Sequence, residues 1–164
     1  MAKKEVKKRL PNVTIEGARI IFRNFAGRQG EFNRAGDRNF CVVLDKELAD
    51  QLAADGWNVK IKEPKEEGDD PLIFLKVKVK FGDFPPVIKQ ITSRGATQLD
   101  EDTVMILDTA AIENVDLIIT PYAYNFQGKD GVSAYLKKMY VTIAEDDLDK
   151  KYSQYDVTEE APFD

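Results

Sequence analysis

The chain has 164 residues, 43% of them apolar, with no histidine, one cysteine and a formal net charge of −5. This length suits one domain with tails, and this apolar share is enough for a hydrophobic core. The missing histidine and the single thiol argue against zinc and haem sites, and no apolar run approaches the about 18–20 residues of a membrane span. We therefore expect a cytoplasmic protein without metal, cofactor or membrane partner.

The negative charge is concentrated at the C-terminal end. Residues 145–164 contain eight acidic side chains and two lysines, a balance of −6, so residues 1–144 carry about +1. Such asymmetry is typical of a nucleic-acid-binding body followed by an acidic tail.

The N-terminal part begins with charge and continues as a strand. Residues 1–11 contain five basic side chains, which predicts a flexible basic arm or, alternatively, a solvated terminus without function. Residues 12–25 alternate between apolar and polar and predict a long strand with a bulge or bend at Gly17. Residues 26–38, with three glycines and three arginines, predict a flexible loop.

The middle of the chain predicts strands and one helix. Residues 40–44 are apolar and predict a buried strand that includes Cys41. Residues 46–54 predict a helix with Asp45 as its N-cap and Gly56 as its end. Further strands are expected at residues 57–63, 72–81 and 87–93, and a second short helix near residues 100–102.

A hairpin is the clearest signal near the C-terminal end. Residues 115–126 and 132–144 are strand-like, and the loop at residues 127–131 contains two glycines. Periodicity then ends, which predicts a disordered tail with a helical turn around residues 147–152. About six or seven strands with two short helices predict a mainly β fold, a small closed barrel or a sandwich.

No enzyme motif is recognisable. The chain contains neither a phosphate-binding G-x-x-x-x-G-K-[ST] loop nor a dinucleotide-binding G-x-G-x-x-G motif. Carboxylates cluster at four places, but nothing pairs them with a nucleophile, a base or a phosphate anchor. We therefore predict no catalytic and no metal-binding residue.

The first binding feature is a series of arginines interleaved with phenylalanines. Because a guanidinium group binds phosphate with two hydrogen bonds and stacks on bases, the series predicts DNA contact. We expect Phe25 and Phe32 to contact the ligand, and Phe22 and Phe40 to lie in the core. A polar surface loop over core phenylalanines is the alternative. The predicted DNA-binding arginines are Arg19, Arg23, Arg28, Arg34 and Arg38.

The second feature is the strict alternation of residues 72–81. One face is apolar, and the other places Phe74 beside Lys76, Lys78 and Lys80. Side chains two residues apart on a strand face lie roughly 6.5–7 Å apart, which suits the phosphates of an extended strand. A lysine row also protects an edge strand from aggregation, and the pattern leaves both interpretations open.

The third feature is an aromatic face on the hairpin. Base stacking on aromatic rings contributes roughly 1–3 kcal/mol per base and tolerates any sequence. The alternative is that these aromatic side chains form core, with Leu117, Ile119 and Ala123 facing solvent. The predicted DNA-binding residues of the hairpin are Tyr122, Tyr124, Phe126, Tyr135 and Lys137.

Two segments resemble a known family. The hairpin PYAYNFQGKDGVSAYLKKMYV at residues 121–141, and the opening NVTIEGARIIFRNF followed by FCVVLD, are similar to bacteriophage single-stranded DNA-binding proteins of the OB-fold type. The resemblance implies an OB-fold-like, five-stranded Greek-key barrel at residues 12–144, with extra strand or hairpin elements and one or two short helices. Carried onto this sequence, it implies DNA contacts by Arg23, Lys76, Lys78, Tyr122, Tyr124, Tyr135 and Lys137.

The tail also resembles that family. Acidic tails with an apolar tip dock other replication proteins there, so residues 145–164 are expected to recruit replication or recombination proteins and to compete for the groove. The family's tip has phenylalanine last, whereas an aspartate ends this chain. A solubilising tail is the alternative. The predicted partner-binding residues are Glu159, Glu160, Pro162, Phe163 and Asp164.

The expected function is therefore sequence-independent binding of single-stranded DNA during phage replication and recombination, in the cytoplasm of the bacterial host. Two alternatives stay open: a protein-interaction or virion β-barrel module that binds no nucleic acid, and a binder of RNA or duplex ends. The oligomeric state is open as well, with a homodimer among the alternatives.

Overall fold

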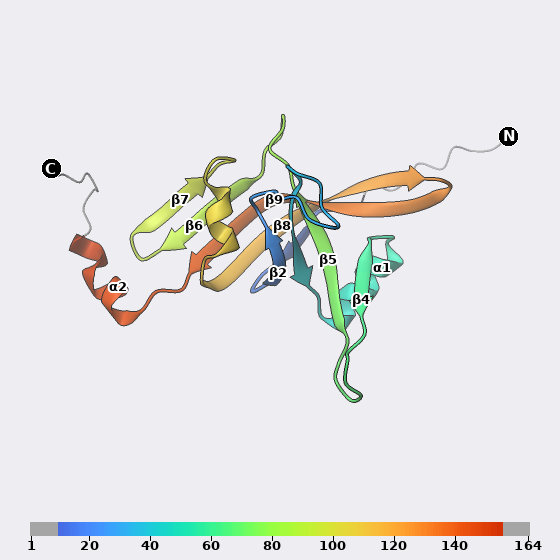
Figure 1. The fold of residues 1–164 in the computed structure, drawn as a ribbon, viewed down its shortest axis with the longest axis horizontal. Helices are drawn as coiled ribbons and strands as arrows, with labels where there is room; N and C mark the ends of the chain where they lie inside the picture. The colour runs from blue at the N-terminus through green and yellow to red at the C-terminus, as the bar shows by residue number, and fades with distance from the viewer. Residues whose placement is uncertain (1–9, 156–164) are drawn as a thin grey trace.

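The computed structural model describes residues 10–155, and the structural statements below concern that part of the chain. Strands dominate it and form one mixed sheet (Figure 1). The strands are β1 (Val13–Ile15), β2 (Arg19–Asn24), β3 (Arg38–Val43), β4 (Val59–Lys62), β5 (Leu72–Val79), β6 (Val87–Thr92), β7 (Gly95–Leu99), β8 (Ile112–Phe126) and β9 (Lys129–Ile143). The helical segments are α1 (Lys46–Ala54), η1 (Val104–Asp108), α2 (Asp147–Tyr152) and η2 (Ser153–Tyr155).

The sheet curls back on itself without a closed ladder. Its main path runs β1-β8-β9-β5-β3-β2, so two strands that follow one another in the chain lie at its two ends. The bend between them is at Gly17, whose φ of 63° favours glycine, as the sequence predicts. The Ala18 N–H donates to the Val115 carbonyl oxygen at 2.7 Å, which brings the start of β2 to β8. This mainly β architecture confirms the predicted OB-like class, in a partly open form.

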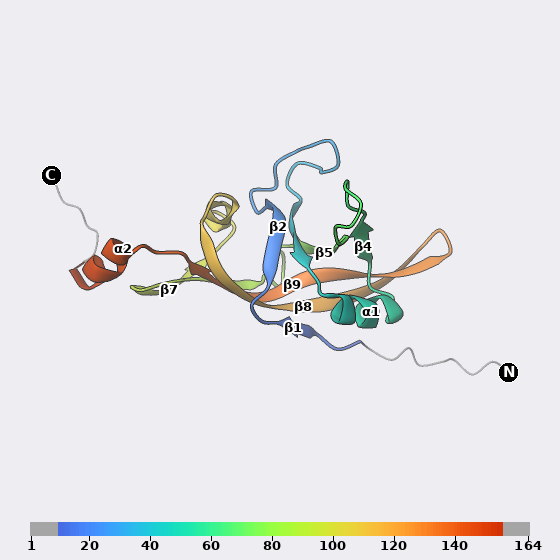
Figure 2. The same ribbon diagram turned by 90° about the horizontal axis from the view of Figure 1, so that it is seen from below.

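The β8–β9 hairpin is the longest feature of the molecule. Its two strands of 15 residues each run along the whole sheet, and its tip extends past the other strands (Figures 1 and 2). The predicted five-residue loop is in fact a two-residue turn, since both Gln127 and Gly128 have positive φ. Positive φ at both central residues matches the right-handed twist of the flanking strands, so pairing continues to the turn.

The core lies on the inner face of the curled sheet. The Phe25 and Phe40 rings stack there with centroids 5.2 Å apart. Helix α1 covers one end, with Ala49 and Leu52 buried. Its N-cap is Asp45, whose side chain accepts from the Leu48 N–H at 2.7 Å, as predicted. The largest fully buried side chains are Phe25, Phe40, Leu75, Ile88, Leu107, Leu117, Ile119 and Met139.

Three elements refine the sequence-based expectations. Strand β7 was not predicted; it pairs only with β6 among the described residues. The short helix expected near residues 100–102 is the 3-10 helix η1, which begins at Val104 after a turn. Helix α2 occupies the predicted position and lies away from the sheet (Figure 1).

None of the helices in residues 10–155 has the length and apolar character needed to cross a membrane.

Candidate nucleic-acid interface

Strand β5 separates the core from an outer, basic face. Leu75 and Val77 are fully buried, whereas Lys78 is exposed, as the alternation predicts. The strand is interior: β3 pairs along one side of it, while β4 and β9 share the other side. Protection of an edge strand therefore does not explain its lysines.

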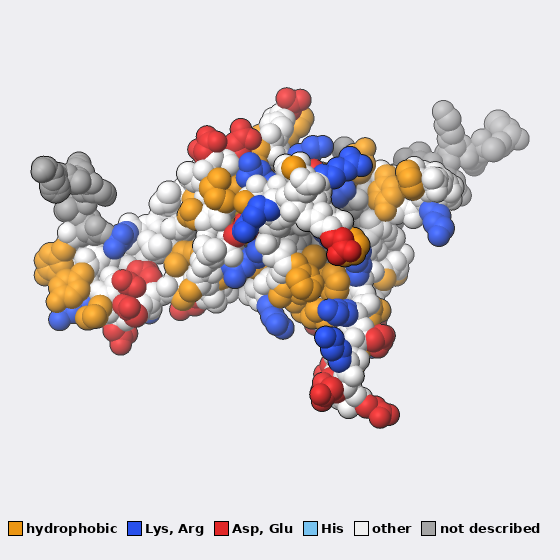
Figure 3. Space-filling view, in the orientation of Figure 1, with side chains coloured by type: hydrophobic (Ala, Val, Ile, Leu, Met, Phe, Trp, Pro, Cys, Tyr) orange, Lys and Arg blue, Asp and Glu red, His pale blue; other side chains and the backbone are white. Residues whose placement is uncertain are grey.

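Four strands bring aromatic and basic side chains into one hollow of about 280 Å³, which we call the tyrosine–lysine groove. None of its lining residues is acidic. Figure 3 shows apolar and basic side chains next to one another over β4 and β5, and acidic ones at the tip of the β4–β5 loop. The groove is lined by Asn58, Lys60, Lys76, Lys78, Tyr122, Tyr124, Ser133 and Tyr135.

The tyrosines of the groove are accessible rings in contact with each other and with a cation. The Tyr122 and Tyr135 rings meet edge to face with centroids 5.7 Å apart, and Tyr122 is 58% exposed. The Lys78 Nζ lies 5.7 Å from the Tyr135 centroid. Leu117 and Ile119 are buried on the opposite face of β8, so the interpretation of these tyrosines as core is wrong.

Three groove residues, Asn58, Lys60 and Ser133, were not predicted. Lys60 lies directly across the β4–β5 ladder from Phe74, which places it in the same row of side chains. The alternating lysines of residues 57–63 were the available signal, but their partner strand cannot be read from the sequence. The Asn58 side chain donates to the Tyr124 hydroxyl at 2.9 Å and so holds one wall of the groove.

Cys41 lies on the same face, opposite Lys76 in the β3–β5 ladder. Burial raises the pKa of its thiol, and the nearby Lys60 and Lys76 ammonium groups partly offset this rise. The thiol is therefore protonated at neutral pH and acts as a small apolar side chain.

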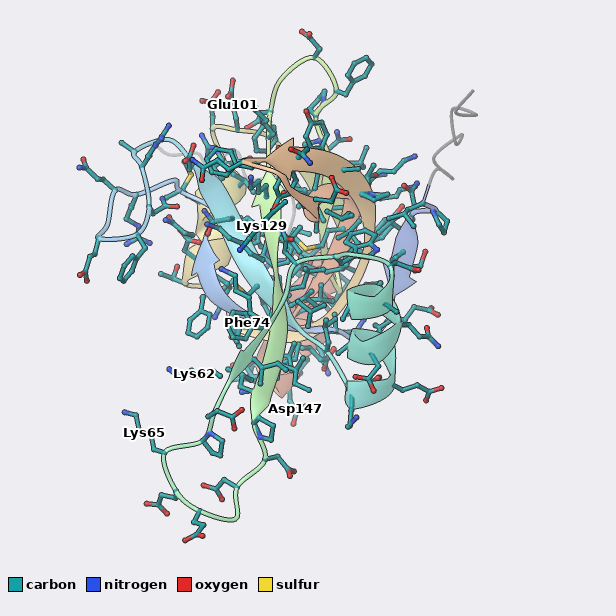
Figure 4. The ribbon with its side chains drawn as sticks, turned by 90° about the vertical axis from the view of Figure 1, so that its right-hand side faces the viewer. Lys62, Lys65, Phe74, Glu101, Lys129 and Asp147 are labelled. Atoms are coloured by element: carbon teal, nitrogen blue, oxygen red, sulfur yellow. The ribbon has the colours of Figure 1, made fainter. Side chains whose placement is uncertain are left out.

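An aromatic pair continues the outer face beyond the groove. The Phe22 and Phe74 rings meet edge to face with centroids 5.7 Å apart. Figure 4 places Phe74 on β5, with Lys62 and Lys65 further along toward the β4–β5 loop. Phe22 is 57% exposed, so the expectation that it belongs to the core is wrong.

This combination of accessible rings, lysines and missing carboxylates is what a single strand of nucleic acid requires of a surface. The sequence matches the family of phage ssDNA-binding domains over residues 2–164. The chain belongs to this family. No curated protein sequence matches it.

Solved structures of phage ssDNA-binding proteins share the fold. The single-stranded DNA-binding protein from bacteriophage Enc34 in complex with ssDNA is similar with a TM-score of 0.54 and 10% identity, over 88% of this chain and 95% of that chain. The Enc34 protein on its own gives a TM-score of 0.53 and 9% identity, over 88% and 89%. Its C-terminally truncated form gives 0.52 and 10%, over 82% and 87%. At such low identity the likeness shows the fold alone.

In this phage ssDNA-binding domain the predicted arginines do not line the groove. The Arg23 guanidinium donates to the Leu107 and Ala110 carbonyl oxygens at 2.7 and 2.9 Å. Arg28 forms an ion pair of 3.1 Å with Asp108. For Arg23 and Arg28, contact with DNA stays a prediction.

The remaining arginines are also spread over the surface. The Arg38 guanidinium donates to the Phe25 carbonyl oxygen at 2.8 Å and lies over the Phe81 ring. Arg19 and Arg34 are exposed. Arg19 on β2 is paired with Val43 on β3, which is paired with Phe74 on β5, so Arg19 and Phe74 belong to one row of side chains across these strands. Contact of these three arginines with DNA likewise stays a prediction.

Side-chain hydrogen bonds connect the parts of the loop at residues 26–38. The Asn33 side-chain amide donates to the carbonyl oxygens of Arg28, Arg34 and Asp37. Phe25, expected to contact the ligand, is completely buried, so that expectation is wrong. A β-bulge in β2 reverses the alternation and turns the ring inward. Phe32 is exposed at the loop surface.

Three other predicted residues, Lys80, Lys137 and Phe126, are not among the lining residues of the groove. Lys80 and Lys137 line a neighbouring hollow of about 750 Å³ that also contacts Tyr135. Lys137 is the extra residue of a bulge in β9, between partners of Ile118 and Ile119. Phe126 is exposed at the hairpin tip. The predicted tail contacts, residues 159, 160 and 162–164, lie outside the described part of the chain.

A larger hollow adjoins the groove and shares Tyr122 and Tyr124 with it. It measures about 880 Å³ and lies between the N-terminal segment, the end of α1 and the hairpin. Asp55 and Asp130 line it, and Lys137 is its one basic side chain among the described residues. Its charge suits a polyanion less well than the smaller tyrosine–lysine groove does. Residues 10–155 contain no group of acidic or thiol side chains that could hold a metal ion.

Proposed function

We propose that this phage ssDNA-binding domain coats single-stranded DNA without sequence preference and that the strand lies in the tyrosine–lysine groove. The observation that carries the proposal is the meeting of Tyr122 and Tyr135 with Lys60, Lys76 and Lys78 in a hollow without carboxylates. Each base has a face that can stack on a ring, so such a surface accepts any sequence.

Binding is driven by electrostatics and stacking together. Lysines that neutralise phosphates release counterions, so affinity falls steeply as salt rises. The rings add roughly 1–3 kcal/mol per stacked base. The protein acts as a non-enzymatic binder in phage replication and recombination, in the cytoplasm of the bacterial host. A homodimer is compatible with this role.

The proposal also assigns roles to the two ends of the chain. Residues 1–11 form a basic arm, residues 12–144 the DNA-binding domain and residues 145–164 an acidic tail. The tail competes with DNA for the groove in the free protein and, once displaced, recruits replication or recombination proteins. Residues 156–164 supply four acidic side chains and no basic one, which supports competition by charge.

A titration at two salt concentrations tests the binding proposal. Labelled oligothymidylate, the matching duplex and an RNA of equal length are each added while fluorescence anisotropy is recorded. We expect the single-stranded DNA to bind most tightly, with a steep loss at higher salt. Binding of none of the three favours the protein-interaction or virion module, and preference for RNA or duplex favours the second alternative, a binder of RNA or duplex ends.

Truncation tests the role of the tail. A chain that ends at Tyr155 keeps α2 and removes four negative charges, and it should bind oligothymidylate more tightly at low salt. The matched control keeps the length and neutralises the charges through Asp156→Asn, Glu159→Gln, Glu160→Gln and Asp164→Asn. Unchanged affinity in both proteins rules out competition for the groove by residues 156–164.

A further inference from the structure

We propose that Phe22 and Phe74 form a second base-stacking platform, so that a bound strand runs from the tyrosine–lysine groove along β5 to β2. The ligand of this platform is an unpaired nucleobase. The inference rests on the proposed function and extends the DNA path beyond the groove described above.

The conformation of Phe22 is the first observation. Phe22 and Arg23 form a bulge in β2: these two residues are opposite the single residue Phe40 on β3. The φ of Phe22 is 51°, in a region where glycine is usual at such a bulge and a bulky residue is an outlier. A large ring in a strained backbone position, with more than half of its surface exposed, gains little from the core. Strain of this kind concentrates at ligand-binding sites.

The placement of the pair is the second observation. Phe74 lies four residues from Lys78 on the same face of β5, about 13 Å away, with Lys76 between them. Lys60 lies across from Phe74 in the β4–β5 ladder. A strand that leaves the groove therefore meets cations on its way to the second pair of rings.

Strand β3 places short side chains next to Lys76 and Phe74. On β3, the residues across from Lys76 and Phe74 are Cys41 and Val43, whose side chains are short. At the far end of the row, Arg19 lies across from Val43 and is exposed. The exposed Arg19 guanidinium is thus in the same row as Phe74 and can bind the phosphate of a base that stacks on the phenylalanine pair.

Tryptophan fluorescence tests the platform directly. The natural Trp57 is buried, so Phe22→Trp adds an exposed reporter at the proposed site. We expect an oligothymidylate of about 16 nucleotides, the upper end of OB-fold site sizes, to quench this reporter. Leu148→Trp on α2 is the exposed control and should keep its emission.

Tyr122→Trp distinguishes the two proposals. Quenching of Tyr122→Trp without quenching of Phe22→Trp overturns the platform and leaves the groove standing. Quenching of neither, with no change in anisotropy, overturns the proposed function and the platform with it.

Affinity provides a second readout. Phe22→Gly removes the ring and suits a positive φ, so thermal stability should be kept. The variant should bind the oligonucleotide of about 16 nucleotides about tenfold more weakly, the loss of one stacked base, yet bind one of about four nucleotides like the wild type. Wild-type affinity for the longer oligonucleotide overturns the platform.

Discussion

Tyr124 lies across the β8–β9 ladder from Gly131, and its ring covers the glycine. A Cβ atom at position 131 would be 2.5 Å from the tyrosine hydroxyl oxygen and 3.0 Å from the Asn58 side-chain oxygen. The Asn58 amide donates to the same hydroxyl at 2.9 Å. This wall of the groove therefore depends on the missing side chain at Gly131, which gives a physical reason for the glycine in the G-V-S-A-Y-L segment.

Gly131→Ala should displace the Tyr124 ring and weaken binding of oligothymidylate by about three- to tenfold, because part of one stacking contribution is lost. Anisotropy titration measures the change. Gly82→Ala is the control, since a Cβ there meets no atom within 4 Å. Equal affinity of the two variants would show that the position of Tyr124 does not matter for binding.

Tyr122→Ala should cost roughly 1–3 kcal/mol of binding free energy, the contribution of one stacked base. The side chain is largely exposed, so the melting temperature should hardly change. Tyr155→Ala, an exposed tyrosine outside the groove, should bind like the wild type. A loss below about 0.5 kcal/mol for Tyr122→Ala, under the stacking range, removes this ring from the interface.

Lys78→Gln should make the fall of log affinity with log salt less steep. The magnitude of the slope should decrease by about 0.7, the value of one phosphate contact on a single strand. The slope is measured by titrations at several salt concentrations. Lys65→Gln changes an exposed lysine in the β4–β5 loop and should leave the slope unchanged (Figure 4). Equal slopes for Lys78→Gln and the wild type contradict a phosphate contact at this lysine.

Asp108→Asn should lower the free energy of unfolding by about 1–3 kcal/mol, because it weakens a buried hydrogen-bond acceptor. The Asp108 side chain is 3% exposed and accepts from the Phe25 and Ala26 N–H groups at 2.6 and 3.0 Å. Urea unfolding measures the loss. The control is Asp50→Asn, whose ion pair with Lys46 is exposed and should contribute less than about 1 kcal/mol. Equal losses in the two variants would refute this role of Asp108.

Glu145 should make the attachment of the segment before α2 sensitive to acid. The Ser93 hydroxyl and N–H donate to its carboxylate at 2.7 and 2.6 Å, and these hydrogen bonds hold its pKa below the ordinary 4.5. Since the folded-state pKa is the lower one, the attachment is complete above pH 4.5 and is lost as pH falls through that lower value.

The Ser93 amide resonance, followed by NMR, should report this transition on the acid side of pH 4.5. In Glu145→Gln the transition should disappear. An acid transition of Ser93 that persists in Glu145→Gln assigns the titration to another group.

Local sequence patterns were enough to predict most of the secondary-structure elements and to predict which face of a strand is exposed to solvent. The alternation of residues 72–81 placed Leu75 and Val77 inside and Lys78 outside, and the N-cap of α1 and the position of α2 were predictable. These features depend on neighbours within a few residues, where side-chain periodicity and capping chemistry act. The tyrosines of the hairpin were likewise predictable as members of one face.

Only the tertiary structure decided which faces meet. Lys60 joins the groove through the register of β4 on β5, and pairing between distant strands is not encoded in either strand alone. The bulge in β2 exchanged the roles of Phe22 and Phe25, because one extra residue inverts the two-residue period from that point on. Arg23 and Arg28 bind oxygen atoms that only the fold places beside them. Arg23 donates to the Leu107 carbonyl oxygen, and Arg28 forms an ion pair with the Asp108 carboxylate. Sequence periodicity determines which side chains share a face of a strand. Long-range strand pairing determines which side chains of other strands lie next to them.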